Sequence, residues 1–120
     1  MNFTHTYSKL PSENIYPKLI RDKIPAIIKA ADGLEVPVRL LVSDDEYLSY
    51  LLKKVVEEAN ELAESKTDSN LVEEISDVYE VIDTLLSLKG ISRDKVLAVQ
   101  DEKKEKRGGF ERRLLMLDTH

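Results

Sequence analysis

Two long amphipathic segments joined by a short polar stretch constrain the fold of this chain more than any other feature. Apolar residues recur at the spacing of one helix face from Leu48 to Ala63, and again from Leu71 to Leu86. The stretch SKTDSN interrupts this pattern between them. Two helices joined by about five residues pack antiparallel, as in a helical bundle. The sequence therefore predicts an all-α fold that resembles a four-helix bundle.

Capping residues mark the ends of the two long helices. Ser43 is followed three residues later by Glu46, the pattern of a capping box, and predicts the start of the first long helix. Asp68 or Ser69 is expected to cap the second long helix. Gly90 suits the left-handed position that follows a helix end, so we expect the second helix to stop there.

Two shorter helices are expected outside this hairpin. The first begins near Asp22, a residue that caps helix N-termini, and it tolerates Pro25 in its first turn and ends at Gly33. The last is capped by Ser92 and runs to about Arg107, where two glycines follow. We find no repeat and no linker, so the sequence predicts a single domain over residues 1–120.

Three segments lack a helical pattern. Residues 1–17 are expected to form an irregular arm, because their two prolines remove backbone donors and favour extended conformations. The segment LEVPVRLLV is rich in β-branched residues and is broken by Pro37, which suggests a short extended piece or an edge strand. The tail FERRLLMLDTH could form a short strand or a packing segment.

Composition excludes several classes of function. The net charge of −5 argues against a nucleic-acid-binding surface. No apolar stretch approaches membrane-spanning length, and the first residues lack the pattern of a signal peptide, so we expect no membrane partner. The absence of cysteine excludes disulfides and thiolate zinc sites and fits a cytoplasmic protein.

Four acids on the two long helices are placed to meet. Glu58 and Glu61 lie on one face of the first helix, and Glu74 and Asp77 lie on one face of the second. At about 100° per residue, both pairs turn to the same side of their apolar stripes. Glu61 and Glu74 are also equally far from a turn centred near Thr67–Asp68, and so are Glu58 and Asp77, so the two pairs lie at matching heights. We therefore expect all four carboxylates to open onto one groove.

A solvated helix face is the alternative interpretation, since glutamate is a strong helix former. In that case Lys54 would pair with Glu58 and Lys53 with Glu57 at the i, i+4 spacing. These pairs would leave the other acids unexplained. Four clustered acids repel one another strongly, which favours binding of a cation.

Oxygen ligands without nearby cysteine or histidine suit Mg²⁺, with Mn²⁺ as an alternative. A carboxylate-bound Mg²⁺ commonly contacts phosphate oxygens and activates a water molecule. Glu57, Glu58 and Glu61 are candidates for accepting the proton of this water. His5 and His120 lie near the chain ends and are expected to be inert.

Basic residues that could meet a polyphosphate form two clusters. The first, KLIRDK, contains Arg21 and Lys23 at the start of a predicted helix, where the helix dipole favours anions. The second contains Lys106 and Arg107 before two glycines, although basic residues in a last turn also simply complement the dipole. Lys54, one turn before Glu58, is a further candidate for binding substrate.

The ordered motifs KLIRDKIPAIIK, EEANE, EEISD and KRGGF resemble the MazG-type all-α nucleotide pyrophosphohydrolases over roughly residues 16–113. More narrowly, they resemble small members described as phosphoribosyl-ATP pyrophosphohydrolase-like. The resemblance implies hydrolysis of nucleoside triphosphates between the α and β phosphates, to a monophosphate and pyrophosphate. It implies a homodimer or homotetramer. It also implies metal ligation by four residues: Glu58, Glu61, Glu74 and Asp77.

Three functional hypotheses follow from these observations. The first is a Mg²⁺-dependent pyrophosphohydrolase that removes non-standard or surplus nucleotides. The second is phosphoribosyl-ATP hydrolysis, whose substrate also carries a triphosphate. The third is a non-catalytic helical module that binds a nucleotide or a partner. At about 100° per residue Asp83 turns away from the groove, so we assign it no metal role.

Overall fold

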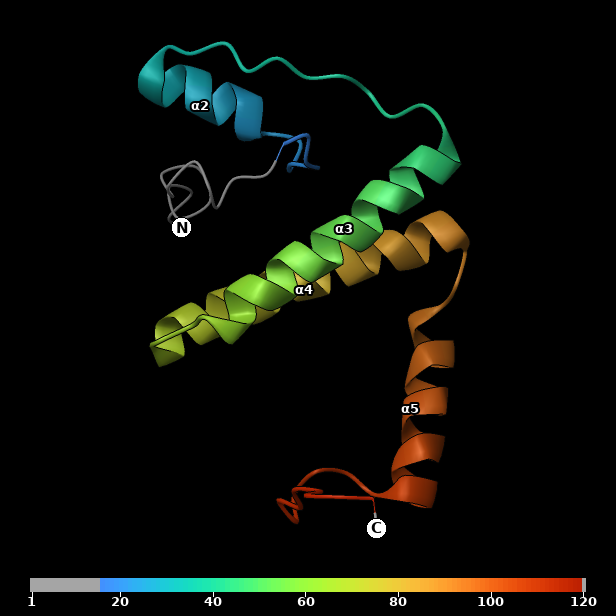
Figure 1. Cartoon of the computed structure of the whole chain (residues 1–120). Helices are drawn as coiled ribbons and strands as arrows, with labels where there is room; N and C mark the ends of the chain where they lie inside the picture. Colours follow the sequence, from blue (N-terminus) through green and yellow to red (C-terminus); the bar gives the residue numbers. More distant parts are fainter. Residues whose placement is uncertain (1–15, 120) are drawn as a thin grey trace. The chain divides into compact units, whose positions relative to one another are not determined.

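A computed structural model describes residues 16–119 and shows an all-helical chain. Its helices are α2 (Ile24–Asp32), α3 (Asp44–Ala63), α4 (Asp68–Lys89) and α5 (Arg93–Arg107), shown in Figure 1. The all-α prediction with four helices is thus confirmed for the described residues. Both histidines lie outside this range, and so does the expected arm at residues 1–17 except for its last two residues. None of the described helices is long and apolar enough to cross a membrane.

The chain divides into two compact units. The first extends to Leu85 and holds α2, α3 and most of α4. The second begins at Leu86 and holds the end of α4, together with α5 and the tail. The expected single domain over residues 1–120 stays a prediction.

Most of the expected helix ends are confirmed. The Ser43 side chain accepts a hydrogen bond from the backbone N–H of Glu46 and caps α3. Ser92 caps α5 in the same way, through the N–H of Lys95. The backbone of Gly33 at the end of α2 is left-handed, at φ 71°. These ends are local features, since each depends on residues within one turn of the cap.

Two helix starts differ from the prediction. Helix α2 begins at Ile24 rather than near Asp22, because a turn from Arg21 to Ile24 precedes it and Lys23 occupies the N-cap position. Helix α4 is capped by Thr67 rather than by Asp68 or Ser69, because the Thr67 hydroxyl accepts from the N–H of Asn70. Each difference is of one or two residues, as is usual at helix ends.

No strand forms among the described residues of the two segments for which one was suggested. Residues 34–42 connect α2 to α3 without regular structure, and residues 110–119 do likewise after α5. Val42 and Leu117 illustrate the reason, since they are 89% and 88% exposed and neither segment has a neighbouring strand with which to pair. The expected extended piece therefore has no role in a sheet.

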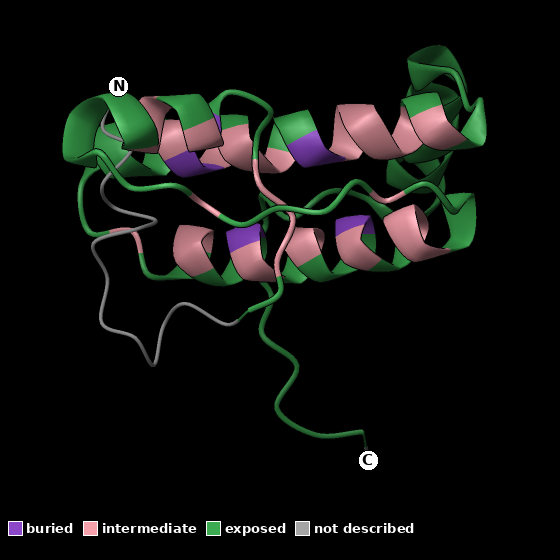
Figure 2. Ribbon diagram, turned by 90° about the horizontal axis from the view of Figure 1, so that it is seen from above, coloured by how far each residue is buried: buried purple, intermediate pink, exposed green. Residues whose placement is uncertain are grey.

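Helices α3 and α4 lie side by side and run in opposite directions, as the sequence predicts (Figures 1 and 2). Their buried residues lie on the sides that face each other. Leu51 and Val81 are the buried apolar residues of the two helices. Glu58 and Glu74 are buried as well, each two helical turns from the buried apolar residue of its own helix. The hairpin thus has an apolar end and, near its loop, an acidic end.

Another side of the same hairpin carries exposed apolar side chains. Leu52 and Val56 on α3 are 49% and 60% exposed, and Val72 and Tyr79 on α4 are 68% and 65% exposed. Counted at about 100° per residue from the buried stripes, these residues turn in the opposite sense to Glu61 and Asp77. The acidic and apolar faces therefore lie on different sides of the hairpin.

Candidate metal centre

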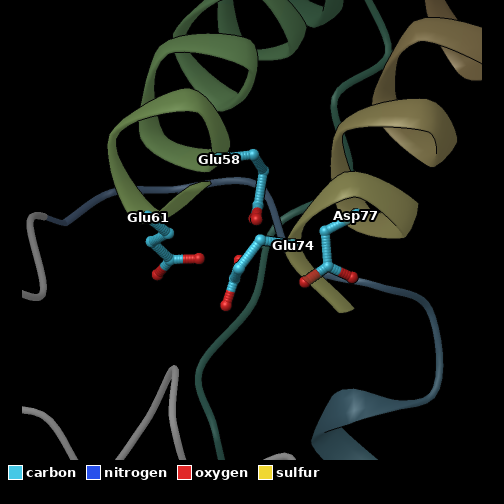
Figure 3. Close-up of side chains that lie close together, drawn as sticks. All are labelled: Glu58, Glu61, Glu74 and Asp77. Atoms are coloured by element: carbon cyan, nitrogen blue, oxygen red, sulfur yellow. The ribbon is translucent and has the colours of Figure 1, made fainter. Parts of the chain in front are cut away.

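Four carboxylates converge at the acidic end of the hairpin (Figure 3). Glu58 and Glu61 extend from α3, and Glu74 and Asp77 extend from α4 toward them. One oxygen from each side chain lies within 4.8 Å of the corresponding oxygens of the other three. The predicted convergence of the four acids is confirmed.

Burial distinguishes this cluster from a solvated helix face. Glu58 is 6% exposed and Glu74 is 7% exposed, although exposed acids would be expected if these spacings only reflected helix propensity. The Oε2 atom of Glu58 is fully buried and has no hydrogen-bond partner in the described part of the chain. A buried, unpaired carboxylate oxygen costs free energy unless a proton or a cation compensates it. The cluster is therefore chemically suited to a cation.

The burial of Glu58 also changes the pKa of its carboxyl group. The pKa of the Glu58 carboxyl is raised from 4.5 to about 7, first because burial disfavours the charged form. The nearby carboxylates of Glu61 and Asp77 raise this pKa as well, while Lys54 acts to lower it. A proton and a divalent cation would thus compete for the same oxygens.

Lys54 contacts two acids on its own helix. Its ammonium bonds the Glu57 carboxylate and lies 3.4 Å from Oε1 of Glu58. The expected Lys54–Glu58 pair is therefore present. The structure pairs Glu57 with Lys54 and places the Lys53 ammonium 4.7 Å from the centre of the Tyr50 ring, in place of the suggested Lys53–Glu57 pair. A lysine three residues before an acid reaches it as readily as one four residues before.

Arg21 reaches the cluster from the segment that precedes α2. Its guanidinium donates a 2.8 Å hydrogen bond to Oδ1 of Asp77. The two residues are 56 positions apart in the sequence, so helix periodicity cannot predict this contact. The structure therefore brings Arg21 to the acids, as it does Lys54, a second predicted substrate-binding residue.

Lys18 is a further cation near the cluster that sequence reasoning did not single out. Its side chain is only 8% exposed, and its ammonium lies 4.0 Å from Oε1 of Glu57. Burial lowers the pKa of Lys18, and the charge of Glu57 opposes that change. Its place three residues before Arg21, in the same basic cluster, was the available signal. Glu57 is consequently bordered by two lysines.

The three other predicted substrate-binding residues, Lys23, Lys106 and Arg107, lie at the ends of helices α2 and α5. Lys23 is an exposed residue at the N-cap of α2, and its side chain makes no cap hydrogen bond. Lys106 and Arg107 lie in the last turn of α5, in the second unit, where Lys106 pairs with Glu102 at 2.8 Å. A substrate-binding role for these three residues stays a prediction.

The donor set fits a hard divalent cation. The four acids supply only carboxylate oxygens, which Mg²⁺ and Mn²⁺ prefer over the nitrogen and sulfur ligands typical of zinc. Comparisons with protein-family models, curated proteins and solved structures found no match for this chain. The four acids can thus hold a metal ion, and the residues of this chain alone support that site.

Proposed function

We propose that this chain is a divalent-cation-dependent nucleoside triphosphate pyrophosphohydrolase that uses Mg²⁺, with Mn²⁺ as an alternative. The observation that carries the proposal is the convergence of four carboxylates within 4.8 Å, next to cationic side chains from a distant segment. Acids that hold a cation beside groups able to bind phosphate oxygens suit cleavage of a polyphosphate. The proposed products are a nucleoside monophosphate and pyrophosphate, and the proposed role is removal of non-standard nucleotides.

The metal would be held by Glu58, Glu61, Glu74 and Asp77, and when bound it would polarise the phosphate chain and acidify a water molecule. Glu57 lies beside this set, where Lys54 bonds it and Lys18 lies near it. These lysines hold the Glu57 carboxylate in place. We assign to Glu57 the acceptance of the proton from the attacking water.

The cations at the rim would bind the substrate's phosphate oxygens. Arg21 offers a planar fork of donors that matches phosphate, and Lys54 offers a compact charge at the edge of the acids. Lys23 in the first unit, and Lys106 and Arg107 in the second, are proposed as further phosphate-binding residues. The positive charges of Arg21 and Lys54 would attract the anionic substrate despite the net charge of −5.

Assembly is the second part of the proposal. Exposed apolar residues on both α3 and α4 leave apolar area that a second copy of the chain can bury. We propose that a homodimer or homotetramer covers it. The exposed side chains that support this oligomer are Leu52, Val56, Val72 and Tyr79.

The direct test is pyrophosphate release from a panel of nucleoside triphosphates and phosphoribosyl-ATP, with Mg²⁺ and with a chelator. Wild type is compared with Glu74→Gln, and Glu64→Gln is the matched control, because Glu64 is exposed and lies outside the four acids. We expect release that requires both the metal and Glu74. Binding without release across the panel would instead indicate the non-catalytic module. The best substrate would decide between the two enzymatic hypotheses.

A further inference from the structure

The ion pair between Arg21 and Asp77 differs from the Lys54–Glu58 pair in its exposure. The Arg21 side chain is 48% exposed and that of Asp77 is 20% exposed. Lys54 and Glu58, by contrast, are 12% and 8% exposed. Solvent screens the attraction within an exposed ion pair, whereas separating the two charges of a buried pair costs more free energy. Arg21 is therefore the more easily displaced of the two cations.

The backbone around Arg21 is anchored, although its side chain is half exposed. The carbonyl of Arg21 accepts a 3.1 Å hydrogen bond from the N–H of Ile24. Ile24 itself is 4% exposed and fixes the start of α2. The guanidinium can thus leave Asp77 by rotation of its side chain, while the backbone keeps it beside the cluster.

Asp77 has two possible counter-ions. Its carboxylate bonds Arg21, and the same side chain supplies an oxygen to the group of four acids that can hold a metal ion. The positive charges of a guanidinium and of a divalent cation repel each other when they share one carboxylate. Binding of a cation would consequently weaken the ion pair between Asp77 and Arg21.

We propose that Arg21 is a displaceable counter-cation: it neutralises Asp77 before the divalent cation binds, leaves Asp77 when the cation binds, and then contacts the phosphate chain. This inference rests on the metal-binding part of the proposed function and adds an order of events to it. The fork of guanidinium donors matches phosphate as well as carboxylate, so the same group can bind either partner. Phosphate binding would then depend on prior loading of the cation.

The test measures metal binding to the full chain by calorimetry with Mn²⁺ and with Mg²⁺. Because an exposed pair is weak, Arg21→Gln should bind the cation about two- to fivefold more tightly than wild type. Arg21→Lys, which keeps the charge, should stay close to wild type. Two controls should leave the affinity unchanged: Lys29→Gln removes an exposed charge that pairs with Glu35, and Arg39→Gln breaks the 2.9 Å pair with Glu46.

A second measurement concerns phosphate. With the cation at saturation, inorganic tripolyphosphate should bind Arg21→Gln about tenfold more weakly than wild type, since a charge-assisted contact is lost. The variant thus changes the two affinities in opposite directions. In the unmodified chain, the guanidinium NMR signal of Arg21 should shift during a Mg²⁺ titration.

Specific outcomes would overturn the inference. Unchanged or weaker metal binding in Arg21→Gln contradicts displacement, and an equal gain in Lys29→Gln would show that only diffuse charge matters. An Arg21 guanidinium NMR signal that does not shift on addition of Mg²⁺ would contradict the inference as well. If wild type binds no divalent cation, the proposed function fails together with this inference. If wild type binds the cation and releases pyrophosphate while Arg21→Gln binds no more tightly, only the role of Arg21 is wrong.

Discussion

Glu58 on α3 and Glu74 on α4 face each other as the buried acids of the hairpin, at 6% and 7% exposure. Each lies on the same helix stripe as a buried apolar residue, Leu51 or Val81. A buried stripe that ends in carboxylates is costly for folding without a proton or cation. The stability of the hairpin and its metal affinity should therefore be linked.

Removal of one of these acids should affect metal binding and stability in opposite directions. Glu74→Gln should weaken Mn²⁺ binding by at least about tenfold, because even the outer partners of metal ligands contribute that much. The metal-free variant should unfold at a higher temperature than wild type, since like charges are removed from a buried cluster. Calorimetric titration and thermal unfolding check both. Glu64→Gln should match wild type, and an unchanged Mn²⁺ affinity in Glu74→Gln would exclude Glu74 as a ligand.

The pKa of Glu58 predicts how stability depends on pH. Its folded-state value of about 7 exceeds the usual 4.5, so the folded state holds this proton more tightly than the unfolded state. The resulting stabilisation is complete below pH 4.5 and is lost as the pH rises through about 7. The difference corresponds to about 3 kcal/mol. Denaturant unfolding of the metal-free chain between these pH values measures it, and Glu58→Gln should flatten the profile.

The same titration predicts the pH dependence of metal binding. Because the cation needs the ionised Glu58 carboxylate, affinity for Mg²⁺ should rise from pH 6 to pH 8, and protons should be released on binding. Calorimetry in buffers of different ionisation enthalpy counts these protons. Binding that is independent of pH over this range would show that Glu58 does not ligate the cation.

The apolar end of the hairpin should contribute ordinary core stability. Leu51 is 1% exposed, so Leu51→Ala should lower the free energy of unfolding by about 2–5 kcal/mol. Leu40→Ala makes the same chemical change at a residue that is 84% exposed and should cost little. Urea denaturation compares the two variants. Equal losses would show that the packing of α3 does not depend on Leu51.

The exposed apolar face predicts the state of assembly. Val56→Lys and Tyr79→Lys place charges on a face that a second copy is proposed to cover, so both should shift the chain toward the monomer. Sedimentation measures this shift, and Ser49→Lys on α3 would show the effect of a charge at an already polar, exposed position. A wild-type chain that sediments as a monomer at high concentration would contradict the proposed assembly.

Much of the fold was determined by local sequence. Ser43, Ser92 and Gly33 fix helix ends through hydrogen bonds or backbone conformation within one turn. The regular rise and rotation of a helix also determined that Glu58 and Glu74 would meet once the hairpin closed. These features could be predicted because each depends on spacing along a single helix or across one short loop.

Tertiary structure alone decided how the acids are compensated. Arg21 reaches Asp77 across 56 residues, and Lys18 is buried beside Glu57, because the segment before α2 returns to the hairpin. The depth of Glu58, and hence its raised pKa, likewise depends on what packs around it. Helical periodicity fixes the direction of a side chain on its own helix. Only the path of the intervening chain determines which distant charge arrives there.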